Sequence, residues 1–132
     1  VSVILMGVGN LGRAILSYFG GRTQQFSVLA AFDTDPEKAG RVIHGCRCYP
    51  LERLIELVKE HEIREAIIAV PASEAQETAN LLYEAGIRGI VNFAPLRLWV
   101  PKGVYVENVD MTMTLERVVY FSREGARARV TG

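Results

Sequence analysis

The N-terminal segment constrains the fold more than any other part of the chain. It begins with a short apolar run from Val3 to Met6, which is followed at once by the glycine pattern Gly7-Val8-Gly9-Asn10-Leu11-Gly12. A short, continuous and β-branched run is typical of a parallel strand that is buried on both faces. The residues from about Asn10 to Phe19 are expected to form a helix. A strand that turns through closely spaced glycines into a helix is the start of a nucleotide-binding βαβ unit.

The three glycines have separate roles in such a unit. Gly7 allows a tight turn at the end of the strand, Gly9 leaves room for a pyrophosphate to approach the backbone, and Gly12 lets the helix pack closely on the strand. The phosphates would accept hydrogen bonds from free N–H groups at the helix N-terminus. Because glycines also cluster in ordinary turns, the pattern alone leaves a purely structural turn as the alternative.

An acidic residue after the second apolar run favours a dinucleotide. The run from Val28 to Phe32 ends at Asp33, which follows Gly12 by 21 residues. At this place a dinucleotide site needs an acceptor for the adenosine ribose hydroxyls. No arginine comes just after Asp33, and its carboxylate would repel a 2′-phosphate, so NADH and NAD are favoured over their phosphorylated forms.

Length, charge and hydropathy narrow the class of protein. The 132 residues suffice for one domain that folds unaided. Fifteen basic residues balance fifteen acidic ones, so no overall basic field would draw this segment to nucleic acid or to an anionic membrane. No apolar run approaches the ~20 residues of a membrane span, and no signal peptide is visible, so we expect a cytoplasmic protein. Cys46 and Cys48 are expected to be free thiols. The chain begins at a core strand without an initiator methionine, which suggests a domain of a longer protein.

Apolar runs and helical patterns alternate along the rest of the chain. Strands are expected at Ala66 to Val70, Gly89 to Phe93 and Val104 to Val106, and Arg41 to Tyr49 is expected to form one short edge strand that reaches Tyr49. The alternation predicts an α/β fold of the Rossmann type, with a doubly wound, mostly parallel sheet. Ligands of such sheets bind at the carboxyl ends of the strands. The loops expected to line one crevice there are Gly7 to Gly12, Asp33 to Asp35, Val70 to Ser73 and Asn92 to Pro95.

Two internal helices have recognisable patterns. The apolar residues after Pro50 have the spacing of one helical stripe: Leu51, Leu54, Ile55 and Val58. The sequence from Ser73 to Gln76 has the spacing of a capping box, in which each side chain bonds a backbone N–H at the start of the helix. This second helix is expected to run to about Ala85 and to stop at Gly86.

The last helix is unusual because its apolar residues spread around most of its circumference. Asp110 is the expected N-cap, and the apolar residues are Met111, Met113, Leu115, Val118, Val119, Tyr120 and Phe121. Such a helix needs burial on more than one side. We therefore divide the chain into a Rossmann domain, 1–109, and a dimerisation helix with its tail, 110–132. A second chain or a further domain would cover the helix, and the alternative is a helix folded back on its own sheet.

Five segments together resemble the Rex family of redox-sensing transcriptional repressors. They are Gly7 to Leu16, Ala31 to Pro36, Val70 to Ala72, Asn92 to Pro95 and Val106 to Asp110. The resemblance covers nearly the whole chain. It implies a domain that binds NADH and NAD+, a homodimer made by exchange of the C-terminal helix, and operator DNA bound through an N-terminal winged helix that this chain lacks. NADH would favour a closed dimer that releases DNA.

The resemblance also assigns roles to residues. It implies a pyrophosphate on Gly7, Val8, Gly9, Asn10, Leu11 and Gly12, and the adenosine ribose on Asp33 with Thr34 beside it. It implies a nicotinamide near Val70, Pro71, Ala72, Asn92, Phe93, Ala94 and Pro95. Tyr18 would respond to the redox state of the nicotinamide through Asp110 of the exchanged helix, and Met111 stands where the family often has phenylalanine. No residue is implied to be catalytic or to bind a metal.

Two other functions remain as alternatives. A small NAD-dependent oxidoreductase or nucleotide-sugar enzyme would need an acid or base, but neither His44 nor His61 lies on a loop that is expected to face the cofactor. A CoA-binding domain would place a ribose 3′-phosphate near the carboxylate of Asp33, which argues against it. The redox sensor is therefore preferred, the enzyme comes second and the CoA domain third.

Overall fold

The computed structural model describes residues 1–19 and 25–131, and a seven-stranded sheet forms its centre. The strand order is β3-β4-β2-β1-β5-β6-β7. Every neighbouring pair is parallel except β3 and β4. The strands are β1 (Ser2–Met6), β2 (Ser27–Phe32), β3 (Val42–Ile43), β4 (Cys46–Tyr49), β5 (Glu65–Ile68), β6 (Gly89–Asn92) and β7 (Tyr105–Asn108). The mostly parallel sheet confirms the predicted fold class.

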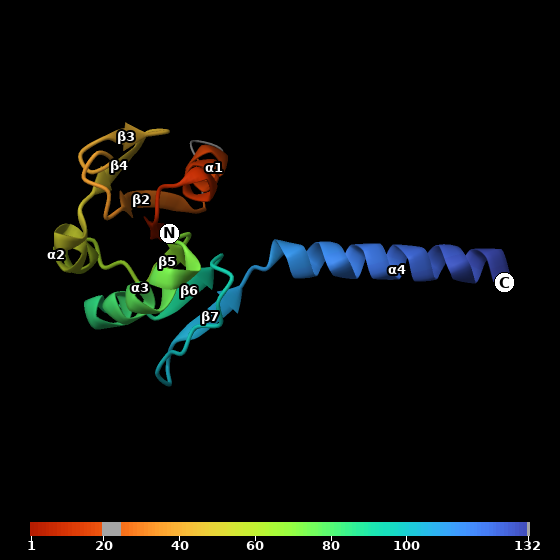
Figure 1. Ribbon diagram of the computed structural model, residues 1–132. Helices are drawn as coiled ribbons and strands as arrows, with labels where there is room; N and C mark the ends of the chain where they lie inside the picture. Colours follow the sequence, from red (N-terminus) through yellow and green to blue (C-terminus); the bar gives the residue numbers. More distant parts are fainter. Residues whose placement is uncertain (20–24, 132) are drawn as a thin grey trace.

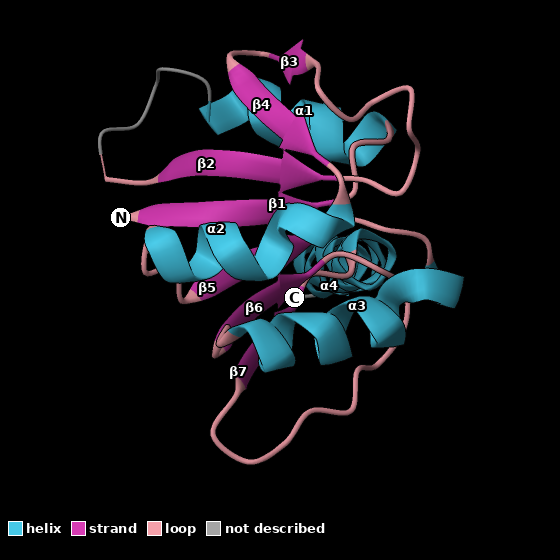
Figure 2. Ribbon diagram, turned by 90° about the vertical axis from the view of Figure 1, so that its left-hand side faces the viewer, coloured by secondary structure: helices cyan, strands magenta, loops and turns pink. Residues whose placement is uncertain are grey.

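Helices cover both faces of this sheet. The helices of the described residues are α1 (Asn10–Phe19), the 3₁₀ helix η1 (Leu51–Arg53), α2 (Leu54–Glu60), α3 (Ala72–Ala85) and α4 (Met111–Thr131), of which α4 does not lie on the sheet. In Figure 2, α2 and α3 lie on the near face of the sheet and α1 lies on the far face. Side chains of β1 alternate between the two faces of the sheet. Ile4 and Met6 pack in the cluster that includes residues of α2 and α3, whereas Leu5 packs in the cluster that includes residues of α1. This double burial explains the continuous apolar run of the first strand.

Three local expectations were wrong. The segment from Arg41 to Tyr49 forms a hairpin rather than one strand, because His44 and Gly45 both adopt positive φ, as a tight hairpin turn requires. Of the two hairpin strands, β4 pairs with β2, and β3 pairs with β4 at the edge of the sheet. In the helix after Pro50, Ile55 is 41% exposed and Leu57 is buried instead. The 3₁₀ turn that precedes α2 has about three residues per turn, so it shifts the phase of the apolar stripe.

The third wrong expectation is the capping box. The N-cap of α3 is Pro71, so Ser73 already lies inside the first turn and makes no capping bond. Gln76 instead bonds the backbone of Trp99. The end of the helix is as predicted, since Gly86 is the C-cap with φ of 107°.

The last helix leaves the sheet instead of folding back on it. Figure 1 shows α4 as a straight rod that points away from the rest of the chain. Asp110 is its N-cap, as predicted, because the Met113 N–H donates to Asp110 Oδ1 at 3.0 Å. The apolar side chains expected on this helix are exposed in the single chain, with Leu115 at 63% and Phe121 at 66%. None of the helices in the described residues has the length and apolar character that crossing a membrane requires.

Candidate functional site

A cavity of about 470 Å³ opens at the carboxyl ends of β1, β2, β5 and β6. All four loops that were expected to line one crevice contribute to it. The predicted residues that line it are Gly7, Val8, Gly9, Asn10, Leu11, Asp33, Thr34, Val70, Pro71, Phe93 and Pro95. The remaining predicted residues of these loops, Gly12, Ala72, Asn92 and Ala94, are not part of its lining.

The glycine turn has the geometry that its sequence predicts. Gly7 has a φ of 100°, and a Cβ there would lie 2.6 Å from the carbonyl oxygen of Ala69. A Cβ at Gly12 would lie 2.0 Å from the carbonyl oxygen of Gly7, so Gly12 acts through close packing of α1 on the turn. At Gly9 a Cβ would meet nothing within 4 Å. Gly9 therefore leaves open space at the cavity, while the other two glycines shape the turn.

Asp33 joins the first two loops of the site. Its Oδ2 accepts a hydrogen bond from the Val8 N–H at 2.8 Å, and its Oδ1 accepts one from the Asp35 N–H at 2.8 Å. These two donors fix the carboxylate at the edge of the cavity. Its remaining lone pairs can accept hydrogen bonds from the hydroxyl groups of a ribose there. Lys38 Nζ lies 4.0 Å from Oδ2 and also lines the cavity.

Sequence reasoning missed several residues of the lining. They are Met6, Phe32, Lys38, Leu51, Ala69, Glu74 and Thr78. Glu74 and Thr78 stand one turn apart near the start of α3, and the Thr78 hydroxyl donates to the Glu74 carbonyl oxygen at 2.8 Å. Their i, i+4 spacing at the start of a helix that follows a parallel strand was the signal that could have found them.

A second cavity of about 720 Å³ adjoins the first at the start of α4. The two cavities share Leu11, Phe93 and Pro95. Asp110 and Met111 line the second cavity, so the structure places them beside the first cavity and not within it.

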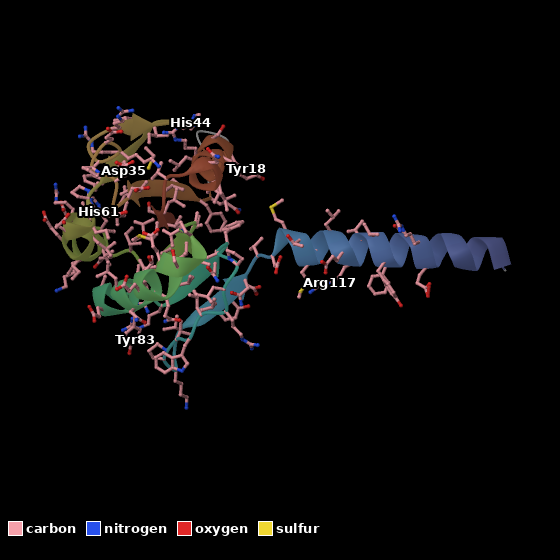
Figure 3. All side chains as sticks on the ribbon, in the orientation of Figure 1. Tyr18, Asp35, His44, His61, Tyr83 and Arg117 are labelled. Carbon is pink, nitrogen blue, oxygen red and sulfur yellow. The ribbon has the colours of Figure 1, made fainter. Side chains whose placement is uncertain are left out.

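Tyr18 lies apart from both cavities in the single chain. Figure 3 shows it on α1, where its side chain is 67% exposed and its ring makes an edge contact with Phe19. Within the described residues no hydrogen bond joins Tyr18 to Asp110. Their pairing as a redox switch stays a prediction, because it requires a second copy of the chain.

The cysteines lie behind the site, on the side of the sheet that α1 covers. Cys46 and Cys48 are both buried, and both are free thiols. Burial, and to a smaller extent the neighbouring Cys48, raises the pKa of the Cys46 thiol to about 11. Burial and the charge of Asp33 raise the pKa of Cys48 as well. Both thiols are therefore protonated near neutral pH.

Known proteins resemble this chain over most of its length. A family model described as the CoA binding domain matches residues 1–96. The redox-sensing transcriptional repressor Rex of Limosilactobacillus reuteri is 46% identical over 121 residues, which cover 92% of this chain and 56% of that protein. The chain thus spans about half the length of the curated relatives it matches.

Solved structures of a Rex-family repressor, RSP, share this fold. The crystal structure of RSP in complex with β-NADH has a TM-score of 0.85 at 32% identity, and the match covers 99% of this chain and 64% of that one. The crystal structure of RSP with β-NAD+ and operator DNA has a TM-score of 0.83 at 32% identity, with 99% and 61% covered.

Proposed function

We propose, from the premise that this chain belongs to the family described as the CoA binding domain, that it is the NADH- and NAD+-sensing domain of a Rex-type transcriptional repressor. The observation that carries the proposal is the cavity formed by the glycine turn and Asp33, in a chain that is 46% identical to a Rex repressor. Its relatives are described as repressors and not as enzymes, which supports a binding role.

The first cavity fits a dinucleotide on two counts. Gly9 leaves open space where a pyrophosphate can approach the backbone, and the first N–H groups of α1 have no partner within the helix. Two backbone N–H groups hold the Asp33 carboxylate at the position where a dinucleotide site needs an acceptor for the ribose hydroxyls. We assign the adenosine half to the loops after β1 and β2, and the nicotinamide half to Val70 to Ala72 and Asn92 to Pro95.

Redox sensing requires a group that distinguishes the two nicotinamide states. The oxidised ring is cationic and the reduced ring is neutral, so a nearby carboxylate interacts differently with the two. Asp110 supplies a carboxylate at the second cavity, which is also lined by Phe93, Ala94 and Pro95. These three residues belong to the segment 92–95, which we call the nicotinamide-side loop. In the proposed dimer, Tyr18 of one copy and Asp110 of the exchanged helix of the other respond to this difference.

The regulatory output is proposed to pass through a homodimer. Exchange of α4 would cover its exposed apolar side chains. NADH shifts the dimer away from its DNA-binding form only as far as its affinities for the two forms differ. Operator DNA would be bound by a winged helix outside this chain; the balanced overall charge and the chain's span of about half the length of its Rex relatives support this assignment. Such a repressor works in the compartment that holds the DNA, which for a bacterium is the cytoplasm.

The test is a calorimetric titration of the chain with NADH, NAD+, NADPH and CoA. The proposal expects NADH to bind at least about tenfold more tightly than NAD+, a difference of about 1.4 kcal/mol, and expects weak binding of NADPH and CoA. Equal affinities for NADH and NAD+ would leave a nucleotide site without a sensing role. Preferential binding of CoA would favour the function that the family description suggests, and would overturn the assignment of Asp33 as a ribose acceptor.

A further inference from the structure

Asn92 is a buried amide that begins the proposed nicotinamide-side loop, residues 92–95, without lining the cavity itself. Among the described residues it is the one polar side chain of the core, at 1% exposure. Its Oδ1 accepts a hydrogen bond from the Ala94 N–H at 3.0 Å, and its Nδ2 donates to the Leu96 carbonyl oxygen at 2.9 Å. These two bonds hold the loop that supplies Phe93 and Pro95 to the nucleotide cavity. A buried amide with this many partners has one allowed orientation.

The same amide also reaches the strand that leads into α4. Asn92 Nδ2 donates a second hydrogen bond to Asn108 Oδ1 at 3.0 Å. Asn92 and Asn108 are opposite each other in the pairing of β6 with β7, and the Val109 N–H donates to the Asn92 carbonyl oxygen at 2.9 Å. Two residues later, Asp110 caps α4. One side chain therefore connects the nicotinamide-side loop to the point from which α4 leaves.

A second amide holds the other end of this loop but does not reach α4. Gln76 Nε2 donates to the Trp99 carbonyl oxygen at 2.8 Å, and Gln76 Oε1 accepts from the Trp99 N–H at 2.8 Å. The segment between Asn92 and Trp99 is thus fixed at both ends, by a buried amide on β6 and by an amide on α3. Only the first is bonded to the strand before α4. The chain therefore contains its own control for loss of a hydrogen bond to this loop.

We propose that the Asn92–Asn108 amide pair links occupancy of the nicotinamide end of the cavity to the position of α4, so that both are positioning residues of the sensor. The inference rests on the proposed function and deepens it. When the nicotinamide-side loop closes on its ligand, Asn92 cannot move without moving either the loop or Asn108. Because coupling between sites is reciprocal, the position of α4 affects nicotinamide binding to the same extent.

The experiment compares NADH with ADP-ribose, which lacks the nicotinamide, by hydrogen exchange of the whole chain. The reporting amides are those of Val109, Met113 and Thr114, whose N–H groups are bonded at the start of α4. In the unaltered chain NADH should slow their exchange at least about threefold more than ADP-ribose does, the size expected for one hydrogen bond. Asn108→Ala, at an exposed position, should abolish that difference while ADP-ribose affinity stays within about twofold.

Two further variants separate a link from a general structural effect. Asn108→Asp keeps an acceptor for Asn92 Nδ2, so it should restore the difference between NADH and ADP-ribose. Gln76→Ala loosens the same loop without touching Asn108, so it should retain the difference. A persistent difference in Asn108→Ala would overturn the proposed link, and so would an equal loss of ADP-ribose binding. If NADH and ADP-ribose slowed exchange of these amides equally in the unaltered chain, the proposed link would be overturned while the nucleotide site would stand. If neither ligand bound, the proposed function itself would be refuted.

Discussion

At the scale of single residues, the charge around Asp33 would decide which nucleotide the proposed site accepts. Asp33 is anchored by the N–H groups of Val8 and Asp35. Lys38 lies 4.0 Å away and offsets part of its negative charge. The carboxylate keeps its position without this lysine, because the two backbone donors hold it. Selectivity against a 2′-phosphate therefore depends on Asp33, and Lys38 moderates it.

Replacement of Asp33 tests this assignment. Asp33→Asn removes the charge and places an amide NH2 group, which cannot accept, opposite one of the two backbone N–H groups. NADH should therefore bind about tenfold more weakly, as expected for loss of hydrogen bonds to a charged group. NADPH should lose less, because the repulsion of its 2′-phosphate is removed as well. Calorimetry with both nucleotides measures the ratio, and the matched control is Asp35→Asn, whose carboxylate accepts a hydrogen bond from the Glu37 N–H. An unchanged ratio of the two affinities would contradict the assignment.

The glycines allow binding to be separated from stability. Gly9→Ala adds a methyl group in open space, so the free energy of unfolding should change little while NADH binding falls tenfold or more, by roughly 1.4 kcal/mol. Gly12→Ala places a Cβ against the Gly7 carbonyl oxygen, and such overpacking costs about 1–3 kcal/mol. Urea unfolding and NADH titration of both variants provide the comparison. Intact NADH binding in Gly9→Ala would remove the pyrophosphate from this turn.

At the scale of elements, the sequence predicted those whose pattern is local and missed those shaped by distant contacts. The glycine turn and α1 were located correctly because the close packing of Gly12 on the Gly7 carbonyl oxygen lies within one βαβ unit. Gln76 was assigned to a cap because its spacing from Ser73 allowed one, but its partner is Trp99, far along the chain. The pocket residue Lys38 was missed although it is near Asp33 in the sequence, because no residue pattern shows that the turn after β2 brings its side chain back to that carboxylate.

The β3–β4 hairpin leads to a prediction about pH. The pKa of the Cys46 thiol is about 11 in the folded chain, against 9.0 for an unperturbed thiol, because burial disfavours the thiolate. Between these two values the unfolded chain releases a proton that the folded chain retains, so stability falls as the pH rises from 9 to 11 and is unaffected below 9. Urea unfolding across this range should show a steeper loss for the unaltered chain than for Cys46→Ala, which does not titrate. Parallel curves would place the thiol in a more polar environment.

At the scale of the whole molecule, the candidate site was predicted only as far as one chain can form it. The loops at the carboxyl ends of the strands meet in one cavity because the sheet order fixes their neighbours. Tyr18 and Asp110 are different, since Asp110 lines the second cavity whereas Tyr18 lines neither cavity in the single chain. Their proposed contact depends on where a second α4 packs. The sequence indicated the pairing of Tyr18 with Asp110 only through the resemblance to the Rex family. That pairing therefore has to be tested on the proposed dimer.

The assembly can be tested through the exposed apolar side chains of α4. Leu115 and Phe121 are 63% and 66% exposed in the single chain, and burying a side chain of this kind contributes about 1.5–3 kcal/mol. Leu115→Glu would place a charge in the proposed interface twice, once from each copy, so the dissociation constant of the dimer should rise at least about a hundredfold. Sedimentation over a micromolar range should show a dimer for the unaltered chain and a monomer for the variant. The control is Ile55→Glu, an exposed apolar position on α2 that should leave the dimer intact. A monomer at all concentrations for the unaltered chain would mean that a different segment, and not a second copy of α4, covers these residues.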